Sequence, residues 1–432
     1  MKKFQIIVIV IFIVLAIFGV LVFSGTIPIG KNSSSTPGAL GNVVLWGFVK
    51  SSVLSTPIDA FNAANTSFVL KYVEKSPDTF DHDLLEALAD GNGPDLILVP
   101  ENLAFHYSAR IFPIPYESYP LASYQSNFAS AGNVFATSKG ILAFPLSIDP
   151  LMMYFNRSTL DANGIVYPPA SWDDLVSITP TLTKKDDANK ITKSAVGLGH
   201  FVNVDNAKAI LSTLLMQAGS PLVSEQNGGV FKSKFDTSNP DLSSSDILNF
   251  YTSFTDPNKA VYTWNRSLPG SGNFFSSENS AFYFGFASEL SSLINRNPNQ
   301  NFGVAAVPQI KNASSKSTYS HVFGVALLSS SRNSNTAFTA ASLLASGDFA
   351  AQFANATGTV PARRDLLNTK KTDAFSNIFY TSALFAKSWL DPASSGTDKI
   401  FSGMIEGAIS NSVTSASALS DASSKLDFLL LR

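Results

Sequence analysis

Residues 43–99 read VVLWGFVKSSVLSTPIDAFNAANTSFVLKYVEKSPDTFDHDLLEALADGNGPDLILV. Three short apolar runs in this stretch are typical of buried strands: 43–46, 68–73 and 95–99. Two helical patterns separate them. Thr56 and Pro57 favour a helix start for one over 56–65, and leucines at helical spacing indicate the other over 81–89. Strands that alternate with helices predict parallel βαβ units, and therefore an α/β fold.

The ends of these predicted strands are the first place to look for a binding site, because ligands bind beyond the carboxyl ends of parallel strands. Trp46 ends the first strand, and Glu101 and Asn102 follow the third. A tryptophan can stack on the apolar face of a sugar, but it can equally be a core residue. Asn102 can bind ligand hydroxyls or cap a helix. We treat all three residues as candidates for ligand binding.

A second α/β stretch follows over 151–307. It shows helical patterns at 172–178, 207–218 and 247–254, and apolar strand patterns at 281–286 and 303–307. After it, a strand at 322–328, a helix at 337–345 and a helical tail are expected. A chain of 432 residues is too long for one ordinary core, so we expect two domains or lobes.

The N-terminus indicates export. Lys2 and Lys3 precede an apolar run of 18 residues at 6–23. A membrane span needs about 17–25 such residues, whereas the apolar part of a cleaved signal has roughly 7–15. We therefore predict a single-pass anchor within 1–25, with the lysines cytoplasmic and the body extracellular or periplasmic. A cleaved signal peptide is the alternative. Residues 26–42, rich in Ser, Gly and Pro, are predicted to be a flexible linker.

Composition excludes several classes of function. The chain is 45% hydrophobic and 14% charged with a net charge of −2, so we expect a globular body that does not bind nucleic acid. The absence of cysteine excludes disulfides, thiolate metal sites and a lipoprotein anchor. Four separated histidines form no zinc-binding motif, and no nucleophile elbow or phosphate-binding loop occurs. We expect no catalytic residue, no metal and no cofactor.

Several segments carry a family resemblance: GPDLIL at 93–98, FPLSID at 144–149, LMMYFN at 151–156, SWDDL at 171–175, FGVAAVP at 302–308 and GTVPAR at 358–363. In order and spacing they resemble extracellular solute-binding proteins of family 1, the maltose-binding-protein-like substrate-binding proteins of ABC transporters. The resemblance runs from Val43 almost to the C-terminus. It departs from the family in the missing lipoprotein cysteine and the sparsely charged surface.

The resemblance implies a two-lobed periplasmic-binding-protein type II fold with a hinge and no catalysis. Lobe I is expected to comprise 43–148 with 309–372, and lobe II 149–308 with 373–432. The expected partners are ABC permease subunits and a small ligand, a mono- or oligosaccharide, held between the lobes of a monomer. A polyamine or organic anion is an alternative ligand, and a membrane-anchored adhesin or lectin-like module is an alternative function.

The resemblance also marks further ligand-binding candidates. Asp149 falls at the hinge, where sugar binders of the family hold a carboxylate, and a carboxylate can accept hydrogen bonds from two hydroxyls. The other interpretation of Asp149 is a turn aspartate before Pro150. Four aromatic residues at loop and strand ends complete the predicted set, although most aromatic residues in this chain belong to the core: Phe201, Phe286, Phe323 and Trp389.

Overall fold

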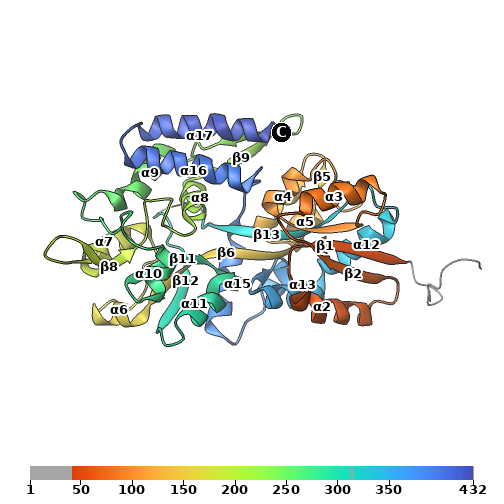
Figure 1. Ribbon diagram of the computed structural model, residues 1–432, viewed down its shortest axis with the longest axis horizontal. Helices are drawn as coiled ribbons and strands as arrows, with labels where there is room; N and C mark the ends of the chain where they lie inside the picture. The colour runs from red at the N-terminus through yellow and green to blue at the C-terminus, as the bar shows by residue number, and fades with distance from the viewer. Residues whose placement is uncertain (1–40, 312, 314, 432) are drawn as a thin grey trace, which may run out of the picture. The chain divides into compact units, whose positions relative to one another are not determined.

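The computed structural model describes residues 41–311, 313 and 315–431 (Figure 1). Residues from Asn42 onward form one compact unit. The predicted anchor at 6–23 lies outside the described residues, as does nearly all of the predicted linker. Within the described ranges, no helix has the length and apolar character needed to cross a membrane.

The opening βαβαβ pattern is confirmed. Strand β1 (Asn42–Gly47) pairs in parallel with β2 (Val69–Glu74) and with β3 (Leu96–Pro100). Helices α2 (Ser51–Ala64) and α3 (Phe80–Ala89) connect them. The predicted helix start at Thr56–Pro57 was wrong, because α2 begins five residues earlier and carries Pro57 in its interior. Burial of Leu54 with Ile58 extends the apolar face of α2 toward its N-terminus.

The sheet continues through two long strands, β6 (Phe144–Asn156) and β13 (Thr318–Leu327). The strand order is β2-β1-β3-β13-β6-β11-β8-β7, and β13 is antiparallel to both β3 and β6. The first half of β6 pairs with β13 and β14 (Val360–Pro361), and its second half pairs with β11 (Ser280–Phe286) and β12 (Phe302–Ala306). β6 therefore joins two groups of strands (Figure 1).

The remaining elements cover the sheet or extend its edges. In the first part of the chain they are α4 (Glu101–His106), α5 (Leu121–Asn127), η1 (Ser130–Phe135), β4 (Ala136–Thr137), β5 (Gly140–Ile141), α6 (Arg157–Ala162), α7 (Trp172–Leu182), β7 (Lys184–Lys185), β8 (Ile191–Val196), α8 (Ala207–Gln217), β9 (Leu222–Gln226) and β10 (Val230–Lys234). In the second part they are α9 (Ser244–Thr252), η2 (Ser253–Thr255), α10 (Ser271–Ser276), η3 (Ala287–Glu289), α11 (Leu290–Arg296), α12 (Ser334–Leu344), α13 (Gly347–Thr357), α14 (Arg364–Leu367), α15 (Ala374–Leu384), β15 (Ala386–Lys387), α16 (Ser394–Ile409) and α17 (Ser415–Leu430).

Two hydrophobic clusters underlie this arrangement. One surrounds β1, β3 and the first half of β6, and includes Trp46 and Phe144. The other surrounds α7, α8 and β11, and includes Trp172 and Trp389. Residues of β6 enter both clusters. The assignment of residues to lobes I and II stays a prediction, and the two names are used below for the predicted sets.

Gln217 ties the second cluster to the segment that crosses back from lobe II. Its Oε1 accepts a hydrogen bond from Trp172 Nε1 at 2.8 Å. Its Nε2 donates to the carbonyls of Pro308 and Ser317, at 3.0 and 2.9 Å. The side chain is buried, so each of these bonds satisfies a group that water cannot reach.

Gln217→Leu should therefore lower the free energy of unfolding by about 2–4 kcal/mol, because it leaves one buried donor and two buried carbonyls without a hydrogen-bond partner. Gln226→Leu is the matched control. Gln226 is exposed and its side chain donates to Ser224 Oγ at the surface, so loss of this side chain should change stability by less than about 0.5 kcal/mol. Denaturant unfolding followed by tryptophan fluorescence measures both. Equal midpoints for the two variants would contradict this role of Gln217.

Candidate functional site

The face of β13 that carries Tyr319, His321 and Phe323 lies where lobe I meets lobe II. Side chains at alternate positions of a strand share a face, so these three point the same way. Tyr319 is buried, but the His321 side chain keeps 39% of its surface exposed. The Phe286 ring of β11 packs against His321, with ring centroids 4.5 Å apart. His321 is thus an accessible polar group with neighbours from both lobes.

Glu101 is fully buried beside His321 and is satisfied by three donors. His321 Nδ1 lies 2.7 Å from Oε1, Tyr319 Oη donates to the same oxygen at 2.9 Å, and the backbone N–H of Val322 donates to Oε2 at 2.9 Å. Burial raises the pKa of Glu101, but the charge and hydrogen bond of His321 outweigh it and hold the pKa below its usual range. Burial lowers the pKa of His321, and Glu101 reverses this to a net increase. Each member of the pair therefore favours the ionised form of the other.

Asp149 lies next to this pair, on β6. It is the register partner of His321 across the β6–β13 pairing. Its carboxylate accepts hydrogen bonds from the backbone N–H and the hydroxyl of Ser288, at 3.0 and 2.6 Å. Burial raises the pKa of Asp149 to about 6, although the bonds from Ser288 and the charge of His321 act in the opposite direction. Asp149 thus connects the predicted hinge to η3 of lobe II.

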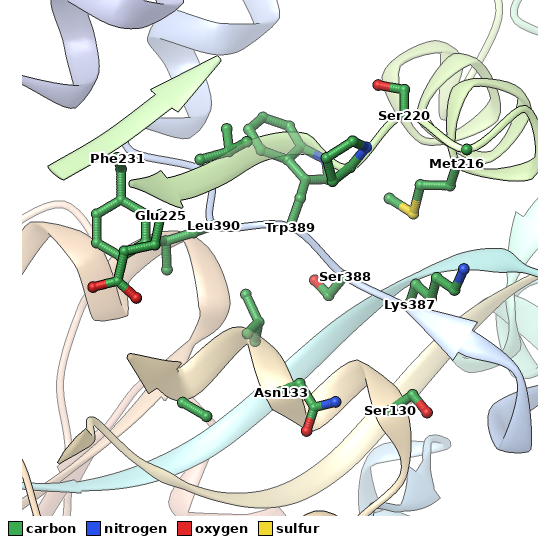
Figure 2. A pocket seen from close by; sticks show the side chains of 15 residues that line it. Ser130, Asn133, Met216, Ser220, Glu225, Phe231, Lys387, Ser388, Trp389 and Leu390 are labelled. Atoms are coloured by element: carbon green, nitrogen blue, oxygen red, sulfur yellow. The ribbon is translucent and has the colours of Figure 1, made fainter. Parts of the chain in front are cut away.

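A cavity of about 550 Å³ lies beside the same strand (Figure 2). The segment 130–136 lines it from lobe I, and the segments 216–225 and 387–390 line it from lobe II together with Phe231. Lys387 is the register partner of Tyr319, which places this wall next to the start of β13. Figure 2 shows Trp389 and Phe231 on one side of the cavity and Asn133 and Ser130 on the other, with the Trp389 ring directed away from Asn133.

Two polar groups of the cavity wall are buried without a hydrogen-bond partner among the described residues: Ser388 Oγ and Trp389 Nε1. Trp389 is 2% exposed, and its ring stacks on Phe401 at 6.2 Å, so the indole cannot turn easily. A buried polar group without a partner costs about 1–3 kcal/mol. A guest in the cavity that offers hydrogen-bonding oxygens would remove that cost.

Contacts at the rim of the cavity join the two lobes. The Glu225 carboxylate accepts hydrogen bonds from the N–H and the hydroxyl of Ser138, which lies between β4 and β5. Nearby, the rings of Phe105 and Phe231 meet edge to face with centroids 5.7 Å apart. These contacts narrow the space between lobe I and the β9–β10 hairpin.

The structure brings most of the predicted site residues together. Glu101, Asp149 and Phe286 contact or pair with His321, and Phe323 lies on the same strand face. Asn102 follows Glu101, and its Oδ1 is buried with no partner among the described residues.

The other predicted residues lie apart from His321. Trp389 lines the cavity. Trp46 is 8% exposed and lies between Phe80 and the Lys75 ammonium, which is 3.9 Å from its ring centroid. Phe201 is half-buried near α16, where its N–H bonds Glu406. The ligand contacts of all eight residues stay predictions.

Sequence reasoning missed His321, Ser288 and Glu225. His321 counts there only as one of four separated histidines, because a single histidine among apolar residues gives no motif. The available signal was alternation: His321 precedes Phe323 by two residues, so both must share a strand face.

Comparison with known proteins supplies a family and a fold. A family model described as bacterial extracellular solute-binding protein matches residues 49–355. A search of curated proteins finds no significant match.

Among solved structures, a cyclo/maltodextrin-binding protein complexed with maltotetraose is 17% identical, with a TM-score of 0.72 over 92% of this chain and 98% of that chain. A cyclic alpha-maltosyl-1,6-maltose binding protein from Arthrobacter globiformis is 15% identical, with a TM-score of 0.74 over 90% and 98%. These similarities establish the predicted two-lobed α/β fold.

The raised pKa of Asp149 predicts a pH-dependent stability. The pKa is about 6 in the folded state against 3.8 for an ordinary aspartate, so the folded chain holds this proton more tightly. The resulting stabilisation is present below about pH 4 and is lost as the pH rises through 6. Two pKa units correspond to about 3 kcal/mol. Relative to wild type, Asp149→Asn should therefore gain about 2–3 kcal/mol of stability between pH 4 and pH 7.

Denaturant unfolding at a series of pH values measures this difference. Asp161→Asn, at an exposed position on α6, is the control and should show no such change relative to wild type. An Asp149→Asn curve that runs parallel to wild type over this range would show that Asp149 is ionised as easily as a surface aspartate.

Proposed function

This chain belongs to the bacterial extracellular solute-binding protein family, and we propose that it captures a mono- or oligosaccharide between its lobes and delivers it to an ABC permease. The proposal is one of binding and presentation, without a catalytic step. In this view lobes I and II close on the sugar through the crossing segments near β6 and β13.

The observation that carries the proposal is the cavity with its unpartnered groups. Its volume of about 550 Å³ falls within the roughly 300–1,000 Å³ of typical ligand sites. Trp389 Nε1 and Ser388 Oγ lack partners among the described residues and are covered in this structure, and we propose that they bond sugar hydroxyls when the cavity wall adjusts to the ligand. Phe231 and Trp389 supply apolar surface for the flat faces of sugar rings.

The charges of the cavity favour a neutral solute. Glu225 and Lys387 contribute one charge of each sign to its lining. A polyamine site would be expected to collect several carboxylates, and an organic-anion site several cationic groups. Structures of similar fold support the same class of ligand. Three of them were determined with maltotetraose, acarbose or tagatose bound, each for a protein less than 20% identical to this chain.

We further propose that the segment 6–23 stays attached and tethers the body to the membrane, with 26–42 as its linker. The body would then capture solutes outside the cell as a monomer. The alternative of an anchored adhesin differs in one respect: an adhesin does not need to close on its ligand, whereas a transport receptor does.

Sugar binding can be tested on the full chain in detergent by thermal shift, with maltose, maltotetraose, acarbose and tagatose, and with spermidine and citrate as non-sugar probes. We expect stabilisation by at least one carbohydrate and none by spermidine or citrate. For the carbohydrate that binds, Trp389→Phe keeps the ring and removes Nε1–H, so affinity should fall about three- to tenfold. Tyr167→Phe, at an exposed position outside the cavity, should leave affinity unchanged. Binding of only spermidine or citrate would overturn the sugar assignment.

The tether predicts that the protein is recovered in the membrane fraction, with its body digested by protease added from outside. The reason is that an apolar run of 18 residues is long enough to span the bilayer core. Mass spectrometry of the mature N-terminus provides the check. A chain that begins near Gly25 would rule out the anchor while leaving export intact.

A further inference from the structure

Glu101 determines which nitrogen of His321 carries a proton. An ionised carboxylate only accepts hydrogen bonds, and Glu101 Oε1 lies 2.7 Å from His321 Nδ1. Tyr319 Oη already donates to the same oxygen, so it does not reverse the direction of the bond. Nδ1 therefore holds a proton whether His321 is charged or neutral. The only nitrogen whose character changes is Nε2, on the opposite edge of the ring.

His321 Nε2 is left available by the protein. None of residues 41–311, 313 and 315–431 forms a hydrogen bond with it, while 39% of the side-chain surface is exposed. Phe286 lies at a centroid distance of 4.5 Å and an interplanar angle of 37°, which covers a face of the imidazole rather than its edge. The ring is thus held by the hydrogen bond at Nδ1 and by its contacts with the Phe286 and Tyr319 rings, while part of the side chain stays exposed.

Asp149 provides an acceptor on the neighbouring strand, although its side chain is largely buried. As the register partner of His321, its Cα lies within about 4.5–5.5 Å of the His321 Cα. A carboxylate has about four lone-pair positions, and Ser288 occupies two of those of Asp149. A donor and a partly free acceptor therefore lie side by side on neighbouring strands of the same sheet.

We propose that His321 is a solute-contacting residue that buried Glu101 presents to the space between the lobes, and that His321 Nε2 and the Asp149 carboxylate bind two adjacent hydroxyl groups of one sugar ring. This inference rests on the proposed function, because it assigns the contact to a sugar. The geometry suits a vicinal diol, since one hydroxyl can accept from Nε2–H while its neighbour donates to Asp149.

The charged groups around His321 give this contact a pH dependence. Glu101 of α4, Asp149 of β6 and Lys208 of α8 influence His321 electrostatically, and Tyr319 of β13 shares its hydrogen-bond network. Burial lowers the pKa of His321, the two carboxylates raise it, Lys208 lowers it, and the net shift is upward. Above that pKa, Nε2 changes from a charged donor to a neutral acceptor. Below about pH 6, Asp149 takes up a proton. Affinity should be highest between about pH 6, where Asp149 loses its proton, and the pKa of His321.

The test is titration calorimetry of the full chain in detergent from pH 5 to pH 9, with maltotetraose as the first probe and maltose, acarbose and tagatose as the others. For wild type we expect a bell-shaped affinity profile. His321→Gln keeps a group that can bond Glu101 but has no charge, so affinity at neutral pH should fall about tenfold and the alkaline limb should disappear. Glu101→Gln should move the alkaline limb to lower pH.

His200→Gln is the matched control, because His200 is also paired with a glutamate, Glu406, but is itself buried and belongs to the predicted lobe II. It should leave both affinity and profile unchanged. A measurement on the wild-type protein alone covers the case in which His321→Gln does not fold. Nitrogen-15 NMR of wild-type histidines should show one imidazole with a raised pKa, and addition of the bound sugar should shift its Nε2 resonance.

Two results would overturn the inference, and they differ from each other. If wild type binds a carbohydrate and His321→Gln binds it equally well with the same pH profile, the contact is wrong while the proposed function stands. If wild type binds none of the four carbohydrates, the proposed function fails, and the diol contact fails with it.

Discussion

The burial of β6 is the constraint on which the rest of this molecule depends. All thirteen of its residues are buried, and different strands pair with its two halves. A backbone that is buried along its whole length needs a hydrogen-bonding partner at every position, so β13, β14, β11 and β12 must all assemble against it. Because of this requirement, both hydrophobic clusters pack against the same strand. β6 also brings Asp149 to the junction, as the register partner of His321 on β13.

Buried residues hold the side chains at this junction in place. Glu101 is inaccessible, yet three donors satisfy it, and through His321 it influences the surface that a solute would meet. An unpaired charge at that depth would be strongly destabilising, so the pair is retained or lost as a unit. Trp389 is held differently, by its stacking on Phe401. The two positions illustrate two ways to fix a side chain at a binding surface: by charge in one case, and by packing in the other.

Local patterns in the sequence predicted the helices and strands well, and the contacts between residues far apart in the sequence poorly. The strands β1, β2 and β3 and the helices α7, α8 and α12 follow from periodicity and apolar runs, since these signals depend on near neighbours. The error at Pro57 arose because a proline at the first turn is favoured and one in the interior is tolerated when packing compensates. Glu101 was found from its place after the third predicted strand, and Asp149 from the family resemblance at the hinge. His321 was missed because its significance comes from a residue 220 positions away.

The rim contacts have a kinetic consequence. Ser138 and Glu225 meet at the edge of the cavity, far along the chain from the groups on the face of β13. If a captured molecule leaves by the lobes moving apart, the carboxylate of Glu225 has to release both bonds from Ser138 before an exit path exists. Residence time would then depend on the bonds between Ser138 and Glu225, while discrimination between cargoes would depend on the whole lining of the cavity. Evolution could lengthen or shorten retention by changing Ser138, which is not among the residues that line the cavity, and leave the choice of molecule as it is.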